Sequence, residues 1–137
     1  MTDPVQIALL SPPDLFPGIT YEHAAVVGDF VFLAGQVARN GRGETVAPND
    51  TLGQLAPTYA NLKRVLEYAG CTPADVVKVT TYLVDASQMQ RVLEAHAAFF
   101  DGHRPPHTLV VVERLTRPDM RIEVDAIARR GSGVRAG

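Results

Sequence analysis

The sequence contains no tryptophan and only one cysteine, and aromatic residues make up 7% of it. The single cysteine, Cys71, cannot form an internal disulfide bond, and no basic residue next to it favours the reactive thiolate. We interpret it as an inert thiol. The four histidines are scattered and show no HExxH spacing, and a CxxC pair is also absent. We therefore expect neither a bound metal nor a cofactor.

Long hydrophobic runs and a surplus of positive charge are also missing. No segment approaches the ~18 consecutive apolar residues of a membrane-spanning helix, and residues 1–4 have neither the basic start nor the apolar core of a signal peptide. The sequence has thirteen basic and fifteen acidic residues, which gives a net charge of −2. Such a charge provides no general attraction for nucleic acid or anionic lipid. We expect a cytoplasmic protein that binds neither nucleic acid nor membranes.

What the sequence does contain is enough apolar material for one core. Its 137 residues are 46% hydrophobic, which predicts a single domain over residues 1–137. We expect the folded core at about 21–128, followed by a flexible tail at 129–137.

The first half of the chain predicts a hairpin and a helix. Apolar runs at 23–27 and 30–34 are joined by the turn residues Gly28 and Asp29. A helix is expected to begin at Thr51, with Gln54 as its capping-box partner, and to end at Gly70. Pro57 predicts either a kink or a later start of the regular helix.

The second half predicts three strands and another helix. Residues 76–83 are rich in β-branched side chains, and strands are also expected at 108–115 and 120–128. A helix is expected between the first two of these strands, starting at Asp85 or Ser87 and ending at Gly102. Its expected inner face consists of Met89, Val92, Leu93, His96, Phe99 and Phe100.

The element order β-β-α-β-α-β-β predicts an α+β fold, with one mixed sheet and two helices on one of its faces. Several strands have apolar side chains on both faces, so the other face also needs cover. In so short a chain that cover is expected to come from another subunit.

One junction stands out for chemistry. Pro105 and Pro106 cannot lie inside a strand, and they lead directly into His107 and an apolar β-branched run. His107 is therefore expected at the start of a strand. Strand alternation places His107 and Leu109 on one face of it, and Glu123 and Asp125 together on a face of the next strand. If these faces meet, the site combines a histidine, a carboxylate and an apolar wall.

Two sequence blocks carry a family resemblance. V-G-D-F-V-F-L-A-G-Q at 27–36 and I-E-V-D-A-I-A at 122–128 resemble those of the RidA/YjgF family of enamine and imine deaminases. Tyr21, Pro105 and several positions between the blocks also match. The resemblance implies a chorismate-mutase-like fold, a homotrimer with a barrel-like core, and a small-molecule ligand held in clefts between adjacent subunits.

The resemblance also implies site residues. Glu123 matches the acidic residue that positions or activates water for attack on the C=N carbon. Burial against apolar neighbours would raise the pKa of such a carboxyl group towards neutrality. The ligand contacts implied by the family are Tyr21, Gly35, Gln36, His107, Thr108 and Leu109. An alternative interpretation is that Glu123 only accepts hydrogen bonds from backbone amides in a subunit interface.

The chain departs from the family at the carboxylate clamp. Active relatives place an arginine where this sequence has His107, and a neutral imidazole lacks the planar, charged fork of a guanidinium. Leu93 and Leu109 also replace polar or cysteine residues, which predicts a more apolar cleft. Two functions therefore stay open: hydrolytic deamination of an enamine or imine with altered substrate preference, or a non-catalytic trimeric module that binds a ligand or a protein.

Overall fold

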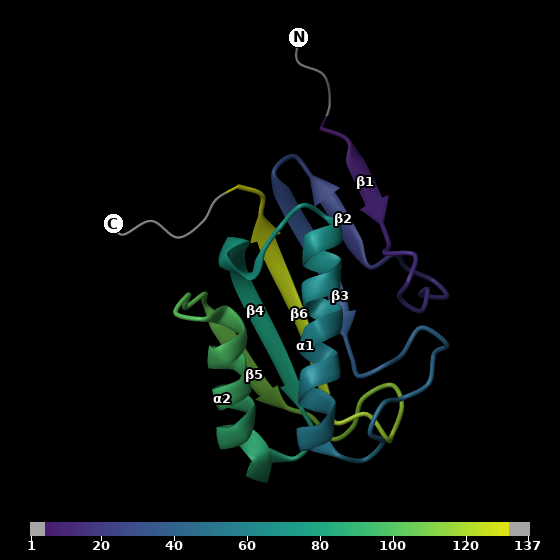
Figure 1. Cartoon of the computed structure of the whole chain (residues 1–137), viewed down its shortest axis with the longest axis vertical. Coiled ribbons are helices and arrows are strands. Elements are labelled where there is room, and N and C mark those ends of the chain that lie inside the picture. Colours follow the sequence, from purple (N-terminus) through teal and green to yellow (C-terminus); the bar gives the residue numbers. More distant parts are fainter. Residues whose placement is uncertain (1–4, 132–137) are drawn as a thin grey trace.

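A computed structural model describes residues 5–131 and shows an α+β fold built on one six-stranded sheet. The elements in chain order are β1 (Ile7–Leu10), β2 (Ala24–Val27), β3 (Phe30–Gln36), α1 (Thr51–Tyr68), η1 (Pro73–Asp75), β4 (Val76–Leu83), η2 (Ala86–Gln88), α2 (Met89–Phe100), β5 (His107–Val111) and β6 (Ile122–Arg129). Both α-helices lie on the same face of the sheet, as Figure 1 shows. The predicted fold class is confirmed.

The sheet is mixed, and its last strand in sequence lies inside it. The strand order is β1-β2-β3-β6-β4-β5, in which only β4 and β5 run parallel. A parallel pair needs a crossover, which α2 supplies. The predicted hairpin is confirmed, because β2 pairs with β3 in the register Val27 to Phe30.

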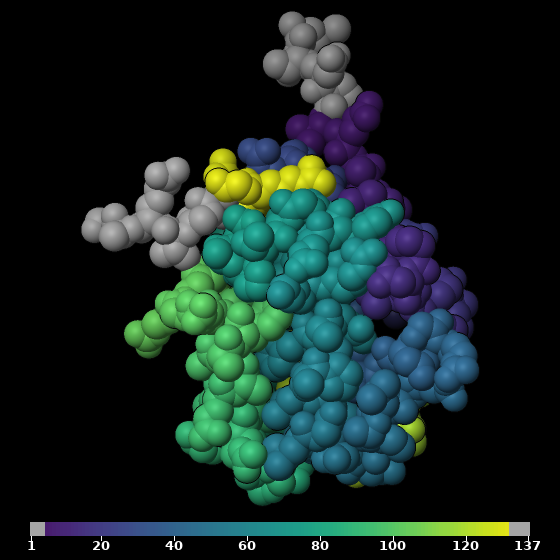
Figure 2. Space-filling model, in the orientation of Figure 1, coloured from purple at the N-terminus to yellow at the C-terminus, as the bar shows by residue number. Residues whose placement is uncertain are grey.

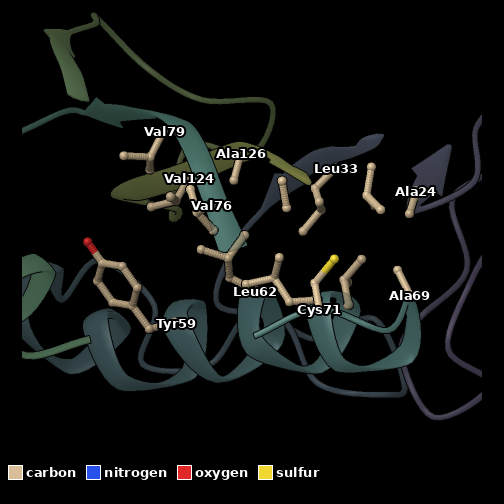
Figure 3. Close-up of a cluster of buried hydrophobic side chains, with 14 of the residues drawn as sticks. Ala24, Leu33, Tyr59, Leu62, Ala69, Cys71, Val76, Val79, Val124 and Ala126 are labelled. Carbon is tan, nitrogen blue, oxygen red and sulfur yellow. The ribbon is translucent and has the colours of Figure 1, made fainter. Parts of the chain in front are cut away.

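The core lies between the sheet and the helix layer. Leu62 and Leu66 of α1 are fully buried in one cluster with Val79 of β4 and Val124 of β6. Figure 3 shows Leu62 pointing from the helix towards the sheet. In the space-filling view, side chains of α1 and α2 hide most of the sheet from this side (Figure 2). No described element covers the opposite face, where Phe30 and Phe32 of β3 remain 42% and 45% exposed.

Helix α1 begins at Thr51, as predicted, but the residue that caps it is Asp50 and not Thr51. Asp50 is the N-cap, and its Oδ1 accepts a hydrogen bond from the Gly53 backbone N–H at 2.9 Å. Gln54 is not a capping-box partner, because its buried amide bonds to Asp119 and Arg121 in the loop before β6. The helix runs through Pro57 without a break.

The C-terminal end of α1 and the start of α2 behave largely as expected. Gly70 follows the α1 C-cap with φ of +84°, a left-handed conformation that favours glycine. Asp85 caps the short helix η2, from which α2 continues at Met89. On α2, Val92 and Phe100 are buried, whereas Met89 and Leu93 are exposed, contrary to prediction. The reason is that α2 lies at the edge of the helix layer, where only part of its apolar face has a partner.

Several strand limits also differ from the prediction. Strand β1 was not predicted. Strand β5 begins at His107 and ends at Val111, and β6 begins at Ile122 and extends to Arg129. The remainder of the predicted tail, 132–137, lies outside the described residues. Within the described chain, neither helix has the length and apolar character needed to cross a membrane.

Candidate active site

A pocket of about 490 Å³ forms where β3, β6 and the segment before β2 meet. It brings together three of the predicted site residues: Tyr21, Gly35 and Glu123. Tyr21 precedes β2, Gly35 lies near the end of β3, and Glu123 is the second residue of β6. These residues come from both ends of the sequence and meet because β6 pairs with β3.

Glu123 packs directly against the backbone of Gly35. A Cβ atom at position 35 would lie 2.7 Å from Glu123 Oε2 and 2.8 Å from its Cδ, well inside van der Waals contact. The φ of Gly35 is not positive, so its backbone conformation does not by itself require glycine. Glycine is needed here because the carboxyl group occupies the space of a side chain. A β-bulge between Leu33 and Gln36 brings this part of β3 against Glu123.

The environment of Glu123 suits proton transfer. Burial raises the pKa of its carboxyl group, and the nearby Asp125 raises it further, whereas the Arg39 guanidinium lowers it. The expected upward shift is confirmed, and desolvation is its main cause. Asp125, on the same face of β6, accepts a hydrogen bond from the Tyr82 hydroxyl at 3.1 Å.

Tyr21 is open to solvent, whereas Gln36 is not. The Tyr21 side chain is 46% exposed, and its ring meets that of His23 edge-on. Gln36 is only 3% exposed, and its Nε2 donates to His23 Nδ1 and to the Ala34 carbonyl. His23 is buried and bonds to the Phe16 carbonyl through Nε2. Gln36 therefore holds the framework behind the pocket and presents no exposed amide.

His107 lies in a second pocket of about 440 Å³, under the C-terminal half of α2. Its ring stacks on that of His96, with centroids 4.0 Å apart, and its Nε2 is 2.9 Å from Thr81 Oγ1. Burial lowers the pKa of His107, and Lys78 lowers it further. Burial also lowers the pKa of His96 to about 4, with His107 as a second cause. Burial therefore favours the neutral form of both rings.

Arg104 and His103 also line this second pocket, whereas Leu109 and Cys71 do not. Arg104 is exposed. His103 is half-buried and bonds to the Val76 carbonyl at 2.7 Å. Leu109 is half-buried and packs against the core. Cys71 is buried and burial raises the pKa of its thiol, in line with an inert role.

Within one chain, His107 and Glu123 lie on opposite faces of the sheet. His107 pairs with Val79, whose side chain is in the core below the helices. Glu123 pairs with Tyr82, on the open face. Thr108 also belongs to the open face, where its hydroxyl accepts a hydrogen bond from Lys78 Nζ at 2.9 Å. A single chain therefore does not bring its histidine and its acidic residue together.

Sequence reasoning missed Arg39 and Arg117, which line the Glu123 pocket. The alternation rule cannot place Arg39, because the bulge in β3 shifts the register just before it. Sequence reasoning also gave His96 no contact with His107. No group of three His, Cys, Asp or Glu side chains in residues 5–131 is arranged to hold a metal ion.

Comparison with known proteins gives consistent matches. The family model described as Endoribonuclease L-PSP matches residues 15–130. A RutC family protein of Pyrococcus horikoshii is 35% identical over 108 residues, which are 79% of this chain and 85% of that protein. A 2-iminobutanoate/2-iminopropanoate deaminase of Escherichia coli K12 is 32% identical over 113 residues, 80% of this chain and 87% of that protein.

A solved structure extends the match to the fold. The crystal structure of Escherichia coli TdcF with bound serine superposes with a TM-score of 0.81 at 28% identity, covering 90% of this chain and 99% of that one.

Proposed function

Because the chain belongs to the Endoribonuclease L-PSP family, which includes the RidA and YjgF proteins, we propose that it hydrolyses a small enamine or imine to a carbonyl compound and ammonia. The observation that carries the proposal is the Glu123 carboxyl group, half-buried in a pocket beside Gly35 and Tyr21 with a raised pKa. Such a carboxyl group can both accept and return a proton, and the raised pKa brings its titration closer to neutral pH.

The chemistry assigned to Glu123 is proton transfer during addition of water. The water oxygen bonds to the imine carbon while the π electrons move to nitrogen, and the carboxylate takes a proton from the water. The carboxyl group passes this proton, and then the second proton of the same water, to nitrogen. The C–N bond breaks, ammonia leaves with the electron pair, and a carbonyl group remains. An enamine enters the same route after it tautomerises to the imine.

We further propose that the working unit is a homotrimer with the ligand in a cleft between two chains. The open face of the sheet supports this, since Ile7, Leu9, Phe30 and Phe32 expose apolar surface there that a second copy would bury. The placement of His107 and Glu123 on opposite faces supports it too. Only a cleft between copies can combine the histidine pocket of one chain with the Glu123 pocket of another.

The His107 side of such a cleft implies an altered substrate preference. The stacked rings of His96 and His107 provide no fixed positive charge there. Leu93 lies on α2, the helix that carries His96, and exposes apolar surface. The same observation favours the second candidate function, a non-catalytic trimer that binds a small apolar ligand or a protein partner. Turnover distinguishes the two.

Ammonia release is the deciding experiment. 2-Iminopropanoate is generated in place by an amino acid oxidase, and its hydrolysis is followed with the wild-type protein and with Glu123→Gln. The proposal expects that wild-type protein accelerates ammonia release and that the variant does not, with nearly the same melting temperature. No acceleration by wild-type protein would favour the non-catalytic module. A large loss of stability in Glu123→Gln would favour the architectural role, since a mismatched buried acceptor costs about 1 to 3 kcal/mol.

The assembly is tested separately by light scattering at micromolar concentration, where the proposal expects the mass of a trimer. A stable monomer would exclude the cleft between subunits.

A further inference from the structure

Arg39 carries a guanidinium group for which the described chain provides no acceptor. It follows β3 and lines the Glu123 pocket. Its Nε is buried without a hydrogen-bond partner, and no ion pair engages the group within residues 5–131. A buried charged donor without an acceptor is costly and calls for an explanation.

The side chain is held in place by stacking. Arg39 Cζ lies 5.3 Å from the centroid of the Phe16 ring, a cation–π arrangement. The backbone beneath it is fixed by Asn61 of α1, whose Nδ2 donates to the carbonyls of Val37 and Arg39 at 2.9 and 3.0 Å. The guanidinium is therefore positioned before any ligand arrives, which lowers the entropic cost of binding.

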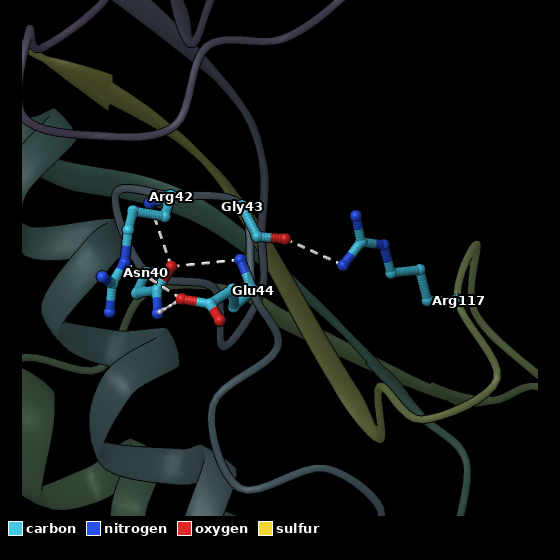
Figure 4. A network of polar contacts seen from close by, with 5 residues as sticks. All are labelled: Asn40, Arg42, Gly43, Glu44 and Arg117. Atoms are coloured by element: carbon cyan, nitrogen blue, oxygen red, sulfur yellow. Dashed lines mark hydrogen bonds and ion pairs between the residues drawn. The ribbon is translucent and has the colours of Figure 1, made fainter.

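The Phe16 ring is itself fixed from behind by the loop at 40–44. A Cβ atom at Gly43 would lie 2.6 Å from Phe16 Cε2, so the loop backbone presses directly on the ring. Asn40 closes this loop by accepting from the backbone N–H groups of Arg42 and Glu44, as Figure 4 shows. Arg117, from the loop before β6, donates to the Gly43 carbonyl at 2.8 Å.

The charges around the pocket favour an anion. Its lining includes two arginines, Arg39 and Arg117, and one carboxyl group, that of Glu123. Arg39 acts on the charge of Glu123 from a distance but forms no ion pair with it within 4.0 Å in the described chain, so its guanidinium is not held by this carboxyl group. A ligand carboxylate would provide the acceptor that Arg39 lacks.

We propose that Arg39 binds the carboxylate of a small 2-imino or 2-oxo acid in the Glu123 pocket. The planar fork of a guanidinium matches a carboxylate with two parallel hydrogen bonds. The carbon that reacts is bonded to the carboxylate carbon, so this placement brings it to the Glu123 side of the cleft. The inference rests on the proposed function. It assigns carboxylate binding to Arg39 in place of the arginine that active relatives have at position 107, so the substrate is still expected to be an acid.

The test is a calorimetric titration with pyruvate, a 2-oxo acid that cannot be deaminated, compared with its uncharged amide, pyruvamide. Wild-type protein is expected to bind pyruvate more tightly than pyruvamide. Arg39→Met keeps an unbranched side chain beside Phe16 and removes the charge. It is expected to weaken pyruvate binding about 10- to 100-fold while leaving pyruvamide binding unaffected. Arg39→Lys keeps the positive charge without the planar fork of the guanidinium. Its affinity for pyruvate is expected to lie between those of wild-type protein and Arg39→Met.

Arg91→Met is the matched control, because Arg91 is an exposed arginine on α2 paired only with Glu94 at the surface. It is expected to bind pyruvate as wild-type protein does. Melting temperatures of all variants are recorded to separate lost binding from lost folding.

Equal pyruvate affinity in wild-type protein and Arg39→Met would overturn the assignment, as would wild-type protein that does not distinguish pyruvate from pyruvamide. The ammonia assay separates this inference from the proposed function. Turnover of 2-iminopropanoate that is unchanged in Arg39→Met would keep the deaminase and reject the Arg39 site. Arg39-dependent pyruvate binding without turnover in wild-type protein would keep the anion site and reject the deaminase.

Discussion

The imidazole rings of His96 and His107 are stacked almost parallel, with centroids 4.0 Å apart and planes inclined by 14°. One ring comes from α2 and the other from the first residue of β5, so the contact joins the helix layer to the edge of the sheet. Two imidazolium ions could not share this position without strong repulsion.

Stability should fall as pH falls, because burial lowers the pKa of both histidines. Below the unfolded-state value of about 6.5 the unfolded chain binds protons that the folded chain does not, down to the His96 pKa of about 4. His96→Phe keeps a ring on His107 and removes one titration. We expect its melting temperature to drop less than that of wild-type protein between pH 7.5 and 5.5. Both proteins retain Glu123, whose own titration cancels in the comparison; parallel pH profiles would contradict the prediction.

Gly35→Ala should displace the Glu123 carboxyl group, because the new Cβ would overlap its outer atoms. We expect a loss of ammonia release and a lower melting temperature, corresponding to about 1 to 3 kcal/mol for an overpacked contact. The double variant Gly35→Ala with Glu123→Ala removes the overlapping atoms, so it should recover most of the stability without recovering activity. An unchanged melting temperature in Gly35→Ala would show that the contact relaxes freely.

The acidic limb of the pH–rate profile should report on the neighbours of Glu123. Arg39 lowers the pKa of this carboxyl group and Asp125 raises it. Arg39→Met should therefore shift the limb of kcat/KM to higher pH, and Asp125→Asn should shift it to lower pH. Shifts in the same direction, or none, would indicate that Glu123 is not the group that titrates.

Asp50→Ala should destabilise the protein by about 1 kcal/mol through loss of the α1 N-cap. Asp50→Asn keeps an acceptor at the same place and should be nearly neutral. Chemical denaturation with both variants measures the difference. Equal losses in the two would mean that charge, and not the cap hydrogen bond, is what position 50 contributes.

Local patterns in the sequence predicted most of the elements of the fold. The β-branched run at 76–83 forms β4 with the predicted limits, and the turn residues Gly28 and Asp29 gave the correct hairpin partner. Strand β1 was not predicted, because its four residues are held by pairing with β2 and are not buried in the core. The residues of the site were harder to predict from the sequence. Tyr21, Gly35 and Glu123 were found from the family resemblance, but the direction of Arg39 depends on a bulge that no periodicity reveals.

The position of β6 has a consequence for how the protein is made. This strand lies between β3 and β4, so the sheet consists of two separate pieces until residues 122–129 are in place. A ribosome synthesises the chain from its N-terminus, and for most of that time β3 and β4 lack their shared neighbour and leave two edges unpaired. Folding of the nascent chain should therefore be completed only after β6 has emerged from the exit tunnel. Until then the edges of β3 and β4 are open to pairing with the wrong strand.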